Sequence, residues 1–284
     1  MKSLIKKLIS QAVQNNLIWT ILNATVIRIA HFASSERKKT IQEVDIKQGI
    51  NIKQEVTSLS PDLTVMHGPF KGLRYSKPEA IGSSFTPKII GSYEKELHPL
   101  LEQICLNNYS EIIDVGCAEG YYAVGLAMRI PDAKVFAYDI NQQAIELCEK
   151  TAQLNNVADR LISGSFCDST TLQSIPLTRK ALIISDCEGY EKALLTKEIA
   201  SYFANHDLLI EVHDFIDIEI STVIRQRFED THTIETVRSI DDITKAQTYE
   251  YDELKRYSLE EKRELLAEYR PHIMEWLYMT PLLK

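Results

Sequence analysis

The sequence predicts an α/β protein with a doubly wound, mostly parallel sheet, and two observations carry this prediction. From residue 111 onward, short apolar segments typical of buried strands alternate with longer segments that have apolar residues at helical spacing. A glycine-containing turn follows the first of these strands, and a carboxylate ends the second. Such an alternation requires a parallel sheet covered by helices on both faces, with ligands bound at the carboxyl ends of the strands.

Composition places the chain among soluble proteins of ordinary size. Its 284 residues, 44% hydrophobic and 25% charged, are enough to bury a full core. The formal net charge of −8 argues against a nucleic-acid partner, because binding to phosphate backbones needs a basic surface. Five cysteines without a C-x-x-C pair are typical of reduced thiols, and hence of a cytoplasmic protein.

The first 62 residues are predicted to be a helical extension followed by a linker. Apolar residues at helical spacing over 4–33 predict one or two helices, but asparagines interrupt them too often for a transmembrane span, and no signal-peptide cleavage site follows. Residues 1–40 hold seven basic side chains and one acidic side chain. We expect these helices to pack on the main domain or to form a homodimer contact; a peripheral helix on a membrane surface is the alternative.

The predicted main domain spans residues 88–284, and a β-hairpin or lid segment at 63–87 precedes it. The turn of this hairpin is expected near Gly68 to Gly72. A helix over 92–105 should lead into the first strand. Strands of the parallel sheet are predicted at 111–115, 134–138, 160–164, 181–185 and 207–212, and helices at 120–130, 142–154, 190–204 and 217–229.

Two further apolar strands are predicted near the end of the chain, at 232–237 and 273–279. Between them, Ser258 and Glu261 have the spacing of a capping box that marks a helix start. An antiparallel hairpin added to the edge of five parallel strands gives a seven-stranded, Rossmann-like sheet. This is the arrangement of class I methyltransferases.

The turn after the first strand, D-V-G-C-A-E-G over residues 114–120, predicts a cofactor site. Gly116 and Gly120 let the backbone approach a ligand and precede the N-terminus of a helix. The G-x-G-x-x-G pattern of dinucleotide sites is missing, and an acid two residues before a G-x-x-x-G turn suits S-adenosylmethionine (SAM) instead. Asp139 ends the second strand, where a carboxylate can bind ribose hydroxyls. A glycine turn without a cofactor is the alternative.

In the SAM interpretation, Asp114 orients the turn and reaches the ammonium group of the cofactor through water, while residues 116–120 surround the methionine tail. The ends of the neighbouring strands complete the site. The residues predicted to bind the cofactor are Asp114, Gly116, Ala118, Gly120, Asp139, Ile140, Ser165, Phe166 and Asp186. Cys117 is expected to be a small residue beside the cofactor and not a nucleophile, because no histidine lies near it in the sequence.

The fourth and fifth strands end in two acidic signatures. Residues 186–191, D-C-E-G-Y-E, and residues 211–213, E-V-H, resemble the D-x-E-G-x-E and E-x-H signatures of FkbM-type SAM-dependent methyltransferases. The resemblance covers residues 88 to 240 and implies a SAM-dependent enzyme, in most such proteins an O-methyltransferase acting on sugars, polyketides and related small molecules. The region before residue 88 is not part of the resemblance, so the acceptor does not follow from it.

Three side chains at this edge are candidates for the chemistry. A hydroxyl acceptor must lose its proton, and His213 is the predicted general base, with Asp186 and Glu188 orienting it or the substrate. Alternatively, the two acids stabilise a helix N-terminus and the histidine is structural. Acids after these strands hold Mg²⁺ in some O-methyltransferases, so Mg²⁺ is a possible second cofactor. Its candidate ligands are Asp186, Glu211, His213 and Asp214.

The sequence thus predicts a SAM-dependent methyltransferase, with O-methylation of a small molecule, sugar or natural product as the expected reaction. Methyl transfer is an in-line displacement, for which positioning alone can supply about 7–11 kcal/mol. A methyltransferase that acts on a nitrogen or protein acceptor is a variant of this hypothesis. The N-P-P-Y signature of amino-methylating enzymes, however, is missing after the fourth strand. A second hypothesis belongs to a different class of function: a non-catalytic protein of this fold that binds a partner through its N-terminal helices and hairpin.

Overall fold

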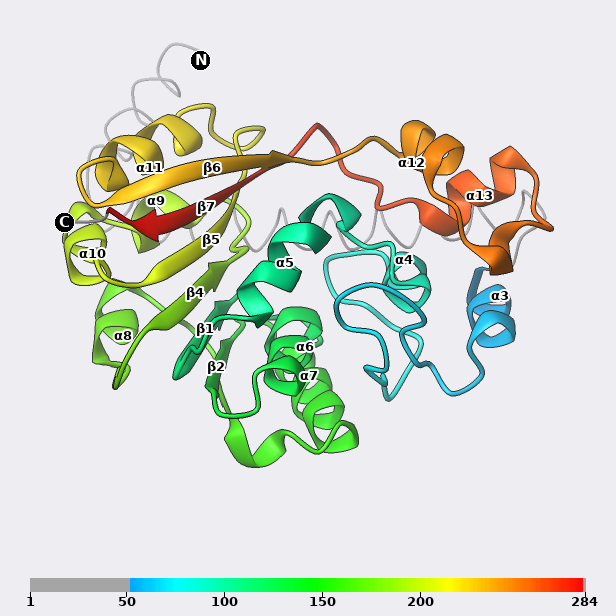
Figure 1. The fold of residues 1–284 in the computed structure, drawn as a ribbon, viewed down its shortest axis with the longest axis horizontal. Helices are drawn as coiled ribbons and strands as arrows, with labels where there is room; N and C mark the ends of the chain where they lie inside the picture. Colours follow the sequence, from blue (N-terminus) through cyan, green and yellow to red (C-terminus); the bar gives the residue numbers. More distant parts are fainter. Residues whose placement is uncertain (1–51, 283–284) are drawn as a thin grey trace, which may run out of the picture. The chain divides into compact units, whose positions relative to one another are not determined.

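A seven-stranded sheet forms the centre of the protein (Figure 1). The computed structural model describes residues 52–282. The strands follow the order β3-β2-β1-β4-β5-β7-β6. They are β1 (Glu111–Val115), β2 (Lys134–Tyr138), β3 (Leu161–Gly164), β4 (Ala181–Ser185), β5 (Asp207–Val212), β6 (His232–Arg238) and β7 (Glu275–Pro281). Strands β1 to β5 are parallel, and β7 is antiparallel to both β5 and β6.

This sheet confirms the predicted fold class. Strands β1, β2, β4 and β5 have the predicted bounds, β3 and β6 differ by one residue at one end, and β7 begins and ends two residues later than predicted. The strand order, with an antiparallel β7 between β5 and β6, is that of a Rossmann-like class I methyltransferase. Strands β1, β4 and β5 are buried along their whole length, as strands covered on both faces must be.

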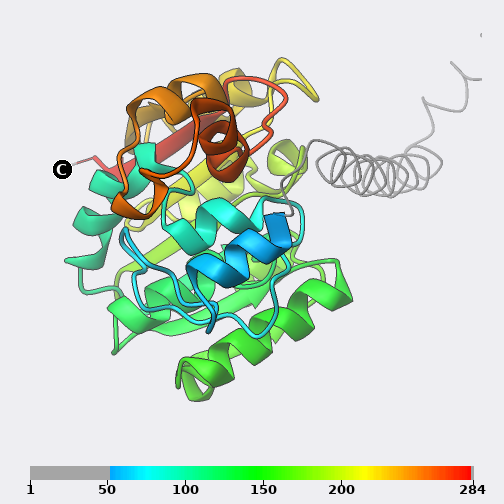
Figure 2. The ribbon, with the colours of Figure 1, turned by 90° about the vertical axis from the view of Figure 1, so that its right-hand side faces the viewer.

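Helices cover both faces of the sheet (Figures 1 and 2). On one face, Ile113 and Ile183 of the sheet pack in a single core with Phe203 and Phe228, next to α10 and within α11. On the other face, α6 contacts β1 and β2, and α7 contacts β3. The helices are α3 (Ile52–Leu59), α4 (Phe85–Ile90), α5 (His98–Cys105), α6 (Tyr121–Arg129), α7 (Gln142–Leu154), α8 (Ser169–Ser174), α9 (Glu191–Leu194), α10 (Lys197–Tyr202), α11 (Ile220–Phe228), α12 (Asp242–Thr248) and α13 (Leu259–Leu266), with short 3₁₀ turns at Lys95–Leu97, Ala158–Arg160 and Asp252–Leu254.

Capping side chains explain where several helices start. Asn141 accepts a hydrogen bond from the backbone N–H of Gln143 at the start of α7, which has the predicted bounds. Ser258 forms the predicted capping box at α13. The single helix predicted over 190–204 is wrong: α9 and α10 are separate, because Thr196 adopts an extended backbone and caps the start of α10.

The segment before the main sheet differs from the predicted hairpin. Within residues 63–87 the strand pairing is limited to one isolated bridge between Thr64 and Arg74, and α4, which the sequence analysis missed, begins at the end of this segment. The amide of Val65 donates to the carbonyl of Leu73 at 2.8 Å, and a tight turn lies between them. A compact loop therefore replaces the predicted pair of strands.

A long insertion, residues 239–274, joins β6 to β7 and contains α12 and α13. Val212, the last residue of β5, lies opposite Glu275, the first residue of β7, so the insertion begins and ends at the carboxyl edge of the parallel strands. Ile90 of α4 packs against Leu265 of α13. Figure 1 shows α12, α13 and α4 beyond that edge of the sheet.

The helices predicted over 4–33, and with them the predicted homodimer and membrane contacts, lie outside the described residues. Within residues 52–282, the helices are too short or too polar to cross a membrane. The chain separates into two units, Met1–Ile52 and Lys53–Lys284. The functional divisions predicted after residues 62 and 87 remain predictions.

Candidate active site

The turn between β1 and α6 has a conformation that favours glycine at two positions. Gly116 and Gly120 have φ angles of 90° and 95°, in the left-handed region that side chains disfavour. A Cβ atom on Gly116 would lie 1.8 Å from the carbonyl oxygen of Asp186. The chain that follows β4 therefore packs directly against the turn, and the ends of β1 and β4 lie together.

Two predicted carboxylates contact the backbone of this turn. Asp114, buried in β1, accepts a hydrogen bond from the backbone N–H of Ala123 in α6, and burial raises the pKa of Asp114 to about 7. Its Oδ2 is buried without a hydrogen-bond partner among the described residues. Asp139, directly after β2, accepts hydrogen bonds from the backbone N–H groups of Ala118 at 3.0 Å and Asn141 at 2.8 Å. The turn is thus fixed by the ends of both strands.

Ile140, Ser165 and Phe166, which were predicted to bind the cofactor, follow the ends of β2 and β3. The two apolar side chains are exposed, Ile140 to 58% and Phe166 to 52%, and Ser165 is exposed beside them. The ring of Phe166 lies 5.6 Å from that of Tyr190. Large apolar side chains gain free energy when they are covered, so this edge suits a flat, apolar ligand group such as adenine.

A buried ion pair beside the turn was not predicted from the sequence. Glu119, between the two glycines, is 1% exposed and pairs with Lys88 of α4, which is 2% exposed. Glu119 also accepts a hydrogen bond from the backbone N–H of Ile81 at 2.9 Å. An acid inside a glycine turn was the available signal, but nothing in the sequence indicates its distant partner. The pair fastens the segment before α5 to the cofactor turn.

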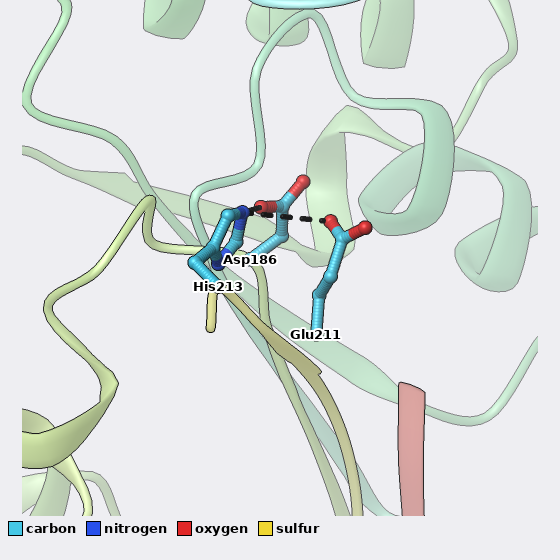
Figure 3. Close-up of side chains that lie close together, drawn as sticks. All are labelled: Asp186, Glu211 and His213. Atoms are coloured by element: carbon cyan, nitrogen blue, oxygen red, sulfur yellow. Dashed lines mark ion pairs between the residues drawn. The ribbon is translucent and has the colours of Figure 1, made fainter. Parts of the chain in front are cut away.

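The ends of β4 and β5 bring Asp186, Glu211 and His213 together, and Figure 3 shows the three side chains pointing toward one another. Glu211 and His213 are two residues apart on an extended segment, so they point to the same face. Because Ser185 lies opposite Ile210 in the sheet, Asp186 comes next to Glu211. One donor atom from each of the three side chains lies within 4.8 Å of the others.

A buried acid orients His213. Nδ1 of His213 lies 2.6 Å from Oε1 of Glu191, and both side chains are buried. Nε2 faces the carboxylates of Asp186 at 3.4 Å, Glu188 at 3.7 Å and Glu211 at 3.9 Å. Burial lowers the pKa of His213, but the hydrogen bond with Glu191 and the surrounding carboxylates outweigh burial and raise this pKa to about 10. The ring is therefore protonated at neutral pH.

The acids around His213 differ in their surroundings. Oδ1 of Asp186 is buried and has no hydrogen-bond partner among residues 52–282, and burial raises the pKa of Asp186 well above its ordinary value. Glu188 has a left-handed backbone with φ of 51°, and its side chain is 44% exposed. Asp214 accepts hydrogen bonds from the N–H and hydroxyl of Ser221, at 2.8 and 2.5 Å, and lies outside the cluster. The structure therefore brings together three of the four candidate metal ligands and leaves Asp214 apart from them.

Arg270 of the insertion, which the sequence analysis also missed, holds Glu211 in place. Its guanidinium pairs with the carboxylates of Glu211, Glu94 and Glu268, all of which are buried. Fully buried Lys245 pairs with Glu268 as well. Three carboxylates therefore face two cations, and burial raises the pKa of Glu94 to about 8. This network connects the insertion to β5 beside the cluster.

The residues at this edge fit SAM. The glycine turn leaves no room for a side chain at Gly116, and Asp114 keeps a buried carboxylate oxygen that can receive the ammonium group directly or through water. Asp139 presents its carboxylate at the end of β2, and Ile140 and Phe166 can cover the adenine. These residues would hold the amino-acid tail, the ribose and the base, respectively.

Comparison with known proteins gives the same assignment. Residues 97–185, from α5 to the end of β4, match the family model described as the methyltransferase small domain. This match and the strand order of the sheet agree with a class I methyltransferase fold. The matched segment includes the glycine turn and Asp139, and it ends just before Asp186.

Named relatives match parts of the chain. A release factor glutamine methyltransferase of Flavobacterium psychrophilum is 31% identical over 108 residues, 37% of this chain and 36% of that protein. A ribosomal protein L11 methyltransferase of a Shewanella species is 43% identical over 61 residues, 22% of this chain and 20% of that protein. The chain thus spans well under two thirds of either relative. A solved putative O-methyltransferase from Klebsiella pneumoniae shares 11% identity with a TM-score of 0.46, covering 86% of this chain and 97% of that one.

Proposed function

We propose that the protein transfers the methyl group of SAM to a hydroxyl oxygen of a small-molecule, sugar or natural-product acceptor, in the manner of the FkbM-type enzymes that its acidic signatures resemble. One observation carries the proposal: a Cβ on Gly116 would lie 1.8 Å from the carbonyl oxygen of Asp186. An acceptor bound at the carboxylates after β4 and β5 would therefore lie beside the cofactor turn. Positioning of this kind can supply about 7–11 kcal/mol toward methyl transfer.

The transfer also requires a proton acceptor. When bound, SAM would supply an activated methyl group to the acceptor oxygen, and the electron pair of the broken carbon–sulfur bond would stay on sulfur. Asp186 is suited to take the hydroxyl proton, because its Oδ1 is buried without a hydrogen-bond partner among the described residues. His213 could act as the predicted base only after losing the proton that its pKa of about 10 retains at pH 7. We therefore propose that His213 orients the carboxylates of Asp186 and Glu188.

Methylation of a protein nitrogen is the second candidate function. The names of the relatives, a release factor glutamine methyltransferase and a ribosomal protein L11 methyltransferase, favour it. The residues after β4 favour a hydroxyl acceptor, because they read D-C-E-G where N-P-P-Y is expected in amino-methylating enzymes. Incubation with methyl-labelled SAM and a cell extract separates the two: label in small molecules supports the first function, and label in protein supports the second.

The cofactor part of the proposal is tested at Asp139. Asp139→Ala removes the acceptor of the Ala118 N–H group and the expected partner of the ribose, so S-adenosylhomocysteine should bind about 10- to 150-fold more weakly, or ~1.5–3 kcal/mol. Asp132→Asn, an exposed acid before β2 at the opposite edge of the sheet, is the matched control and should bind normally. Calorimetry that detects binding of NAD but not of SAM by the unmodified protein would refute the proposal.

A further inference from the structure

We propose that Asp186, Glu211 and His213 form a binding site for one divalent transition-metal ion of the Mn²⁺, Fe²⁺ or Zn²⁺ class. The site lies at the carboxyl ends of β4 and β5, where Figure 3 shows the three side chains converging. Binding of the ion follows from these residues alone. Its use in holding the methyl acceptor rests on the proposed function. With Oδ1 of Asp186 bound to the ion, the hydroxyl proton would go to the other oxygen of that carboxylate.

The separations between the donor atoms suit a shared cation better than direct hydrogen bonds. Nε2 of His213 lies 3.4 Å from Oδ1 of Asp186 and 3.9 Å from Oε2 of Glu211, whereas N–H···O bonds usually measure about 2.7–3.2 Å. With metal–ligand bonds of about 2.0–2.2 Å, two ligands of a tetrahedral ion lie ~3.4 Å apart and two opposite ligands of an octahedral ion ~4.2 Å apart. Both measured separations fall within this range.

Asp186 supplies an independent indication of a missing ligand. Its Oδ1 is buried, and no group within residues 52–282 donates a hydrogen bond to it, although Nε2 of His213 lies 3.4 Å away. Buried polar atoms in native proteins nearly always have a partner, and an exception indicates a bound water or ion. A cation placed between this oxygen and the other two donors would satisfy it, and on binding Nε2 it would displace the proton that His213 carries without the ion.

The other two ligands are held in orientations that leave one donor atom each for the ion. Glu191 accepts the hydrogen bond of Nδ1 of His213 at 2.6 Å, so Nε2 faces the cluster. A carboxylate behind a ligating histidine is the usual arrangement in protein metal sites, where it fixes the ring. Arg270 binds Oε1 of Glu211 and leaves Oε2 directed at His213.

The donor set indicates the class of metal. Ca²⁺ and Mg²⁺ prefer sets made of oxygen ligands, whereas one imidazole nitrogen with two carboxylates suits Mn²⁺, Fe²⁺ or Zn²⁺. This argues for a transition metal in place of the Mg²⁺ that the sequence suggested. Three protein ligands also leave coordination positions open, as in catalytic rather than structural sites. Oxygen atoms of a hydroxylated acceptor are the groups that these positions would take.

The test measures Mn²⁺ binding to the full-length protein after treatment with a chelator. Calorimetry should detect one site, and Asp186→Asn and His213→Ala should weaken it at least tenfold. Glu191→Gln, a positioning variant, should weaken it by about 10- to 100-fold. Asp214→Asn is the matched control and should bind Mn²⁺ as the unmodified protein does, because its carboxylate is engaged with Ser221. Electron paramagnetic resonance should detect a nitrogen ligand on Mn²⁺ that His213→Ala removes.

Two outcomes would overturn the metal site: neither Mn²⁺ nor Zn²⁺ binds to the unmodified protein, or Asp186→Asn binds Mn²⁺ unchanged. Because His213→Ala removes a buried ring and can unfold the protein, the partly exposed Asp186 provides the decisive variant. S-adenosylhomocysteine binding is measured on the same samples. Cofactor binding without metal binding refutes this inference alone, and metal binding without cofactor binding refutes the proposed function alone.

Discussion

Gly116 illustrates how one residue without a side chain brings two strand ends together. Its φ of 90° and the approach of Asp186 both require glycine. Gly116→Ala should therefore lower the free energy of unfolding by about 1–3 kcal/mol from backbone strain alone, and further from the clash, and it should abolish binding of S-adenosylhomocysteine. Urea unfolding and calorimetry measure the two effects.

Gly72 is a matched control for this substitution. It has a similar φ of 94°, but a Cβ there would meet no atom within 4 Å. Gly72→Ala should therefore show the cost of the backbone conformation without the clash, and it should leave cofactor binding intact. Equal losses of stability in the two alanine variants would show that the contact of Gly116 with Asp186 has no energetic role.

Individual residues also show how far a sequence predicts a site. Asp186 and His213 follow strand ends, and Glu211 lies one residue before the end of β5. The twofold period of a strand with parallel pairing is enough to expect all three at one edge. The direction of Asp214 depends on its hydrogen bonds to Ser221, and no periodicity encodes these. For the same reason the Glu191 contact with His213 was missed, although Glu191 belongs to the acidic signature.

Whole elements were predictable where burial alone decides their conformation. Strands β1, β4 and β5 are buried along their whole length and mostly apolar, so their bounds follow from the sequence. The break between α9 and α10 depends on the local cap at Thr196, and the loop at 63–87 is held by contacts with distant elements, such as the bonds between Arg74 and Asn155. Local sequence patterns do not predict such contacts.

The insertion between β6 and β7 depends on Arg270 for its attachment to the sheet. Arg270→Met leaves Glu94, Glu211 and Glu268 buried without this cation, so stability should fall by about 3–5 kcal/mol. Hydrogen exchange of residues 239–274 should become faster. Arg263→Met, an exposed arginine of α13 that pairs with its neighbour Glu264, is the control and should cost less than about 1 kcal/mol. Unchanged exchange in the Arg270 variant would contradict this role.

Across the whole molecule, the balance of buried charge depends on pH. Three buried carboxylates share Arg270 and Lys245, and burial raises the pKa of Glu94 to about 8. The hydroxyl of Tyr122 also hydrogen-bonds Glu94. Other acids act in the opposite direction: the hydrogen bond from Arg129 lowers the pKa of Glu102. The pH dependence of stability is therefore a sum of opposing contributions, and single variants are needed to separate them.

Glu94→Gln should isolate one of these contributions. Below pH 4.5 the carboxyl group of Glu94 is protonated in both the folded and the unfolded chain. Between pH 4.5 and about 8 it is ionised in the unfolded chain but still protonated in the folded chain. The free energy of unfolding therefore falls as pH rises through this range. Stability measured by urea unfolding should therefore fall more steeply with pH in the unmodified protein than in Glu94→Gln, by at most about 1.4 kcal/mol per pH unit. Glu102→Gln should differ with the opposite sign, since the unmodified protein gains stability from Glu102 as pH rises and the group ionises. Parallel curves for the unmodified protein and Glu94→Gln between pH 5 and 8 would show that Glu94 is ionised in the fold, and that Arg270 balances its charge.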